Sequence, residues 1–432
     1  MDVPNFTLPE HALRLALNDE VHARPPVRLA GDQQIVYLAV RHDPSDRAAH
    51  RQALARLAQA AGAPVAPTVD HAVVKLSEGL RFKWEGHAEF ASYTFFAEGA
   101  GDQPPAAVLA RAGWPEAAAS LPGEVLVAVS INLVSFPGDT PPVDAFRTEA
   151  DTVVGGAVAE GRGWGYADFR VREDGFTRFL LLNREMGLGQ AGRMVQRLLE
   201  IETYRMMALL AFPVARTAAP DLGAMETELA AIVERIAGAS PEDEARLLDD
   251  LTRLAARVEH LQSATRFRFE AAEAYDALVA RRLAELREVR IPGLSTIGEF
   301  LHRRLAPAMA TCRSTSRRIG NLAARLTRAS ALLRTRVDIE REQRNQKILE
   351  SMNRRGRLQL RLQQTVEGLS VVVITYYGVS LVGVIAKSIK AAGVAWDPEL
   401  VMGIAVPIVA AVVFGGVHRV RKALEGEEKG TS

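Results

Sequence analysis

Two long apolar runs close to the C-terminus dominate the pattern of hydrophobic and polar positions along the chain. They cover Gly368 to Ala386 and Leu400 to Val417, and neither contains a charged residue. Each run is close to the roughly 20 residues that a helix needs to cross the hydrocarbon core of a bilayer. Because only a short polar link separates them, the pattern predicts a transmembrane helical hairpin at residues 367–418, followed by a tail at 419–432.

Basic residues flank this hairpin on both sides. Those before the first run are Arg354, Arg355, Arg357 and Arg361, and those after the second are Arg419, Arg421 and Lys422. Positively charged flanks stay on the cytoplasmic side of a membrane, which predicts that both termini are cytoplasmic. The N-terminus has no basic start followed by an apolar core, so we expect no secretory signal.

The first half of the chain alternates between strand and helix patterns. Short β-branched or aromatic segments bounded by Gly, Pro or Asp predict strands at 34–40, 71–76, 88–97, 125–134, 166–173 and 176–183. The last two are joined by Asp174-Gly175, which indicates a tight hairpin. With a helical segment at Ser45 to Ala61, the pattern predicts an α+β cytoplasmic domain with a largely antiparallel sheet at residues 1–215.

From Gly192 onward the hydrophobic period becomes that of helices. We expect one helix that ends at Pro213, a second block at 221–290 broken near 239–242, and a third helix that starts near Ser295. This third helix is interrupted at most by Pro307 and continues into the first apolar run. The pattern predicts long antiparallel, coiled-coil-like helices that form a stalk region at residues 216–366.

Composition and motifs give little support for catalysis. The 53 Lys plus Arg balance the 52 Asp plus Glu, and the single cysteine, Cys312, excludes an intramolecular disulfide and a cysteine metal cluster. The histidines lack zinc-ligand spacing, and no phosphate-loop or GxSxG motif occurs. We interpret the glycine-rich stretch at 155–165 as a flexible or tightly turning connection. We therefore expect no enzyme activity, no metal and no cofactor.

The basic stalk suggests lipid rather than nucleic acid as a partner. Arginines close to a bilayer can hold anionic headgroups. Nucleic-acid binding would call for aromatic residues among the basic ones or a recognised binding fold, and the stalk has neither. Membrane lipids are thus the predicted partner of this region.

A polar cluster near the N-terminus offers donors, acceptors and a general base within a few residues. Its members are Asn18, Glu20, His22 and Arg24. The same residues can cap a helix that ends near Leu17 and organise the proline-locked segment that follows. We interpret the cluster as structural.

Four segments carry a resemblance to a known family, at 11–26 (HALRLALNDEVHARPP), 163–183, 196–216 and 357–383. Together they resemble a bacterial family of unknown function whose members are described as predicted membrane-anchored proteins. The resemblance implies an anchor in the bacterial inner membrane and a cytoplasmic domain. It supplies no activity, ligand or catalytic residue. Our leading hypothesis is an oligomeric scaffold or interaction protein, held off the bilayer by its stalk.

A second hypothesis comes from the order of the elements. An α+β domain, antiparallel helices and a long helix that runs into the first of two C-terminal membrane helices resemble CorA-type divalent-cation channels. In such an oligomer Ser370, Tyr377 and Ser380 would line the pore, since their spacing places them near one helical face. That family carries Gly-Met-Asn after a tyrosine, whereas Gly378, Val379 and Ser380 follow Tyr377 here. We therefore favour close helix packing at Gly378, Ser380 and Gly383 over a selectivity element.

Overall fold

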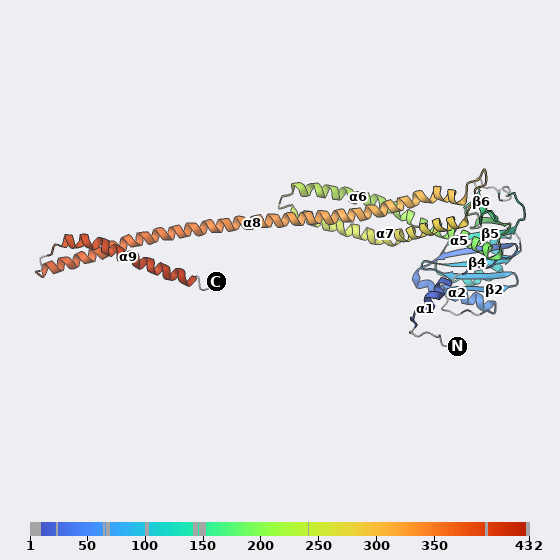
Figure 1. The fold of residues 1–432 in the computed structure, drawn as a ribbon, viewed down its shortest axis with the longest axis horizontal. Helices are drawn as coiled ribbons and strands as arrows, with labels where there is room; N and C mark the ends of the chain where they lie inside the picture. The colour runs from blue at the N-terminus through green and yellow to red at the C-terminus, as the bar shows by residue number, and fades with distance from the viewer. Residues whose placement is uncertain are drawn as a thin grey trace. The chain divides into compact units, whose positions relative to one another are not determined.

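The computed structural model confirms the predicted fold class, with a mixed sheet domain first, long helices next and two apolar helices at the end (Figure 1). It describes residues 10–22, 25–63, 65, 70–99, 103–140, 146, 153–240, 242–393 and 396–428. The chain divides into two compact units. The first, which we call the head unit, is Met1–Gly238 with Ala245–Ser330, and the second is Ala239–Glu244 with Ala331–Ser432.

An eight-stranded sheet forms the centre of the head unit. Its strands are β1 (Gln33–Arg41), β2 (His71–Ser77), β3 (Leu80–Gly86), β4 (Phe90–Glu98), β5 (Glu124–Ser135), β6 (Val154–Val158), β7 (Gly163–Ala167) and β8 (Thr177–Asn183). Their order across the sheet is β2-β3-β4-β1-β5-β8-β7-β6. The pair β5 and β8 is parallel and the other described pairs are antiparallel. The prediction of a largely antiparallel sheet is confirmed.

The predicted hairpin at Asp174-Gly175 is only partly right. The turn is present, because Gly175 has a φ of 82° and its N–H donates to the carbonyl of Arg172 at 2.9 Å. However, β7 already ends at Ala167, so the strand expected at 166–173 is wrong beyond that residue. The Asp168 carboxylate accepts hydrogen bonds from the Arg170 N–H at 3.1 Å and the Arg172 guanidinium at 2.8 Å. These local bonds hold the chain in a longer connection instead of a continued strand.

Most of the glycine-rich stretch lies in the strands β6 and β7, whereas Gly161 lies in the tight turn between them, with a φ of 87°. The interpretation as a tightly turning connection is therefore right for Gly161 and wrong for the other glycines. Gly155 and Gly156 lie in β6. A Cβ on Gly155 would lie 2.3 Å from the Gly165 carbonyl oxygen, and one on Gly156 would lie 2.8 Å from that of Val289. Val289 exchanges two backbone hydrogen bonds with Ala157, so the segment after α7 covers the free edge of β6. Glycine is required here because backbone approaches backbone closely.

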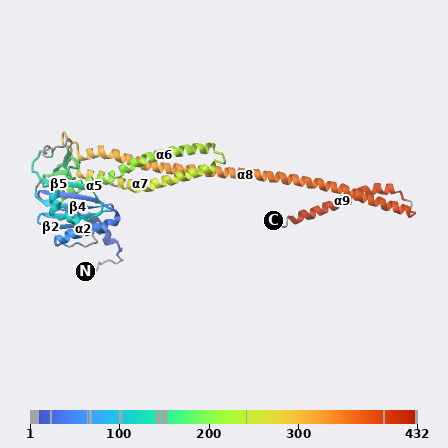
Figure 2. The same cartoon turned by 180° about the vertical axis from the view of Figure 1, so that it is seen from behind.

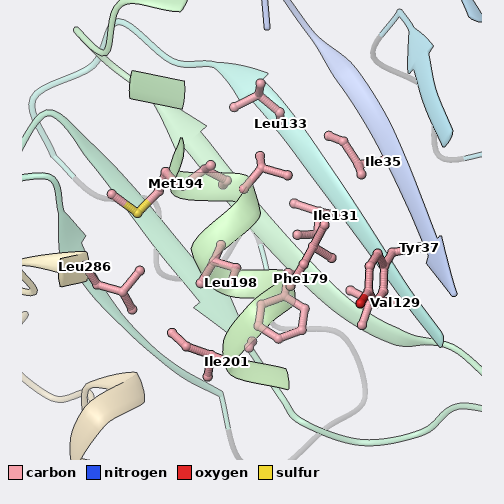
Figure 3. Close-up of a cluster of buried hydrophobic side chains, with 14 of the residues drawn as sticks. Ile35, Tyr37, Val129, Ile131, Leu133, Phe179, Met194, Leu198, Ile201 and Leu286 are labelled. Carbon is pink, nitrogen blue, oxygen red and sulfur yellow. The ribbon is translucent and has the colours of Figure 1, made fainter. Parts of the chain in front are cut away.

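Helices cover both faces of the sheet. On one face the helices α2 (Arg47–Ala60), α3 (Pro105–Arg111) and α4 (Trp114–Ala118) bury a cluster that includes Trp84 and Tyr93; a short 3₁₀ helix, η1 (Pro44–Asp46), precedes α2. On the other face α5 (Leu188–Leu209) packs Met194 and Leu198 against Ile131 and Phe179 (Figure 3). The head unit is therefore a three-layer structure with an apolar core on each face of the sheet, and a further apolar cluster includes Trp164, Tyr166 and Leu182.

Long helices make up most of the remaining chain. They are α6 (Ala211–Gly238), α7 (Glu244–Leu286), α8 (Ile297–Ala391) and α9 (Pro398–Glu428). Within the head unit, α6, α7 and the first part of α8 lie side by side (Figures 1 and 2). Ion pairs join them, from Arg318 to Glu226 at 2.7 Å and from Arg313 to Asp276 at 3.0 Å.

The helix boundaries correct two predictions. Pro213 does not stop the helical chain, because it lies in the first turn of α6, where a missing N–H costs nothing. At the N-terminus, α1 (Arg14–His22) continues past Leu17, so Asn18 does not mark the end of a helix. Pro307 lies inside α8 as allowed for, and the helix runs unbroken into the first apolar run.

Candidate functional site

The two apolar runs form the end of α8 and most of α9, and both helices are long and apolar enough to cross a membrane. Large apolar side chains point outward from them. Leu369 is 65% exposed, Val412 70% and Phe414 65%. In a water-soluble protein such side chains are normally buried in the core, so this exposure is the first indication of an apolar surrounding.

The inner sides of the two helices carry small residues and pack on each other. A Cβ on Gly378 would lie 2.7 Å from Val409 Cγ1, and one on Gly383 would lie 2.4 Å from Met402 Sδ. Ala386 is buried as well. Both views of the fold show α9 returning along the end of α8 (Figures 1 and 2). The small residues allow the two backbones to approach closely, as is common where helices pack in a membrane.

The three candidate pore residues lie away from this contact. Ser370, Tyr377 and Ser380 are exposed, and with 3.6 residues per turn the middle of the face that they occupy on α8 lies opposite the midpoint between Gly378 and Gly383. The Ser370 hydroxyl donates to the Val366 carbonyl at 2.9 Å within the same helix. Ser380 thus does not share the packing side with the two glycines. Pore lining stays a prediction.

The basic residues that flank the two apolar runs lie on α8 and α9. The side chains of Arg354, Arg355, Arg357 and Arg361 are exposed on α8 ahead of the first run, and Arg419 is exposed on α9 after the second. Arg421 and Lys422 lie in the helical backbone of α9, and their side chains are outside the described part of the chain.

The N-terminal polar cluster is described in part. Asn18, Glu20 and His22 belong to α1, the side chains of Glu20 and His22 lie outside the described residues, and so does the whole of Arg24. The Asn18 amide donates to Asp19 Oδ1 at 3.4 Å. A structural role of the cluster stays a prediction.

A polar cavity in the head unit was not predicted from the sequence. This head cavity has a volume of about 220 Å³ and lies between the sheet and α5, with one wall from α7. Its floor holds Lys83 Nζ and Glu85 Oε1 at 2.9 Å from each other, with only 5% and 13% of the two side chains exposed. Charged groups buried to this extent are rare and need a partner.

Strand register assembles the floor of the head cavity. Across neighbouring strands Lys83 lies opposite Thr94, and Thr94 lies opposite Tyr37. In the next row Glu85 lies opposite Ser92. Because side chains alternate between the faces of a strand, these residues share one face, while Phe82 and Trp84 point into the core on the other face.

Some polar groups that line the head cavity have hydrogen-bond partners, whereas Ser92 has none in the described structure. The Tyr37 hydroxyl lies 2.8 Å from Thr203 Oγ1, and the Thr203 hydroxyl donates to the Leu199 carbonyl at 2.8 Å, so Tyr37 donates to Thr203. Burial raises the pKa of the Tyr37 hydroxyl, which keeps it protonated. By contrast, Ser92 Oγ is buried and has no hydrogen-bond partner in the described structure.

The side of the head cavity that α5 and α7 form carries charged groups, and these groups pair with each other. The Glu200 carboxylate on α5 forms an ion pair with Arg282 of α7 and accepts a hydrogen bond from Gln196 at 2.8 Å. Within the described residues, no group of three or more His, Cys, Asp or Glu side chains could hold a metal ion. The arrangement can bind a small polar molecule through charge and hydroxyl contacts.

A sequence signal for this cavity existed in the segment LRFKWEG, residues 80–86. In this segment Phe82 and Trp84 alternate with Lys83 and Glu85, which is typical of a strand. The charged residues make the segment less apolar than the other strands, and for this reason it was not predicted as one. Because β3 was not predicted, Lys83 and Glu85 could not be placed on one face of the sheet.

Comparison with known proteins supports a family assignment. The model of a family described as "Protein of unknown function (DUF3422)" matches residues 9–424. Comparison with curated proteins and with solved structures gave no match. Because the family model covers nearly the whole chain, this protein belongs to the DUF3422 family, whose function is unknown.

Proposed function

We propose that this protein is a multi-pass protein of the bacterial inner membrane, anchored by the end of α8 and by α9, with both termini in the cytoplasm. The observation that carries the proposal is the surface of the two apolar runs, where large apolar side chains are exposed instead of buried. Exposed apolar surface costs about 25 cal/mol per Å² in water, and lipid removes that cost. The arginine flanks support the orientation.

On this anchor the head unit serves as an oligomeric scaffold or interaction domain. Its partners in this proposal are membrane lipids and further copies of the same chain, without nucleic acid. The exposed hydroxyls of Ser370, Tyr377 and Ser380 support self-association, because hydroxyl groups inside a bilayer favour contact with another helix over contact with lipid. The proposal assigns the chain no catalytic step and no cofactor.

Site-directed labelling tests the topology. Cysteines introduced at Ala392 and, separately, at Thr431 are exposed in intact cells to a membrane-impermeant reagent, in a Cys312→Ala background. We expect reaction at position 392 only, because the short link faces away from the cytoplasm. Permeabilised cells, in which both positions should react, provide the control. Labelling at 431 in intact cells would contradict the orientation.

A divalent-cation channel is the second candidate, and one observation favours it. The face that carries Ser370, Tyr377 and Ser380 is turned away from α9 and is free to line a pore in an oligomer. Polar pore groups replace part of an ion's hydration, so Tyr377→Phe and Ser380→Ala should alter flux if these residues line a pore. For the scaffold we expect liposomes with the purified protein to take up no more magnesium than empty ones. Magnesium uptake that changes with these two substitutions would make the channel the first candidate and the scaffold the second.

A further inference from the structure

The head cavity interrupts an otherwise apolar face of the sheet. Phe90 and Phe96 lie on either side of its floor, and α5 covers it with Val195 and Leu199. A core that served stability alone would place apolar residues here, since replacing a buried ion pair with well-packed hydrophobic residues is often neutral or stabilising. The two polar rows therefore call for a reason other than folding.

Charge and size limit what this cavity can hold. Lys83 and Arg282 contribute two positive charges to its lining, and Glu85 and Glu200 contribute two negative ones. An anion or a cation alone would add an unbalanced buried charge, which is strongly unfavourable, whereas a zwitterion keeps the cavity neutral. A volume of about 220 Å³ is below the roughly 300 to 1,000 Å³ that hold drug-sized ligands.

The pairing inside the cavity shows where such a ligand would bind. Glu200 is already engaged by Arg282 and Gln196. Lys83 and Glu85 are engaged with each other at 2.9 Å, and the hydroxyl of Ser92, opposite Glu85 in the register, has no partner. A ligand that carries both charges can exchange the Lys83–Glu85 contact for two contacts of its own, and it can satisfy Ser92 as well.

We propose that the head cavity binds a free α-amino acid, whose carboxylate pairs with Lys83, whose ammonium group pairs with Glu85 and whose polar head hydrogen-bonds to Ser92. The side chain of the ligand lies against Leu199 of α5. The full-length protein is thus a membrane-anchored receptor for a small zwitterion. This site is independent of the membrane helices.

Binding is measured on the full chain in detergent with each of the twenty free L-amino acids, first as a shift of the melting temperature and then by calorimetry. We expect at least one amino acid to raise the melting temperature, because a ligand that binds only the folded state stabilises it. Its N-acetyl and carboxamide derivatives should bind roughly tenfold more weakly or worse, since each lacks one charge. Equal binding of either derivative, or no shift with any amino acid, would overturn the proposal.

Two variants separate a binding role from a structural one. Ser92→Ala removes a hydroxyl that nothing in the described structure satisfies, so the melting temperature without ligand should stay the same or rise while affinity falls. Lys83→Met with Glu85→Met keeps the cavity neutral and should abolish binding. The matched control, Lys75→Met with Glu78→Met, removes an exposed ion pair near the same edge of the sheet and should leave affinity unchanged. Full affinity in the cavity double variant would place the ligand elsewhere and refute the assignment.

Discussion

The sheet domain and the terminal pair of helices use the same apolar residue types in opposite ways. Leu133 in β5 is 1% exposed, whereas Leu369 in α8 is 65% exposed. In the head unit, α2 to α4 cover one face of the sheet and α5 covers the other, so the protein itself removes apolar surface from water. In the terminal pair only the inner sides are covered. Apolar content alone thus cannot distinguish a core from a lipid-facing surface; the layers that surround it can.

Separating the two regions should produce the largest effect. A chain that ends after Leu349 lacks both apolar runs, so we expect it in the soluble fraction, with mixed helix and strand content by circular dichroism. The matched control ends after Arg419, keeps both runs and should stay with the membranes after high-salt and carbonate washing. If the shorter chain also remained with the membranes, a segment before Leu349 would have to bind lipid.

Replacing a phenylalanine with alanine should change the free energy of unfolding by different amounts in the two regions. Phe82→Ala removes a fully buried ring that stacks on Phe95 with 5.0 Å between centroids, and it should lower the free energy of unfolding by about 3 to 5 kcal/mol. Phe414→Ala removes a ring that is 65% exposed and should change the unfolding of the head unit by less than about 0.5 kcal/mol. Denaturant unfolding in detergent, followed by tryptophan fluorescence, compares the two. Similar losses would mean that the two regions unfold as one.

The parts of the fold predicted from sequence are those with a long or regular local signal. The apolar runs, the continuation through Pro307 and most strands were predicted because each depends on residues close in sequence. The strand β6 was not, because Gly155 and Gly156 have low strand propensity. Gly156 is required because its backbone lies close to that of Val289, more than a hundred residues away, and Gly155 because its backbone lies close to Gly165 of β7.

The same distinction applies to the candidate sites. The common face of Ser370, Tyr377 and Ser380 follows from helix geometry and could be predicted. The head cavity could not, since its groups come from elements far apart in the chain, among them Tyr37 in β1, Glu85 in β3 and Thr203 in α5. Only the register of the sheet and the position of α5 bring them together.

The smallest expected effect is that of pH on stability. It sharpens the comparison because the group responsible, His50, lies in the head unit. Burial between the sheet and α2, together with the neighbouring His42 ring at 4.2 Å, lowers the pKa of His50 from 6.5 to about 4. Its Nδ1 contacts the Tyr93 hydroxyl at 2.7 Å, and the nearby Asp46 opposes the shift.

Well above pH 6.5 His50 is neutral in both the folded and the unfolded chain, so it adds no pH dependence there. Between pH 6.5 and about 4 the unfolded chain takes up a proton that the folded one does not, and stability falls as the pH falls. From pH 7 to 5.5 we expect a loss of about 1 kcal/mol, measured by denaturant unfolding. His50→Gln should remove this part of the slope, while His260→Gln, at an exposed position on α7, should retain it. An unchanged slope in His50→Gln would show that another buried group of the head unit sets its acid sensitivity.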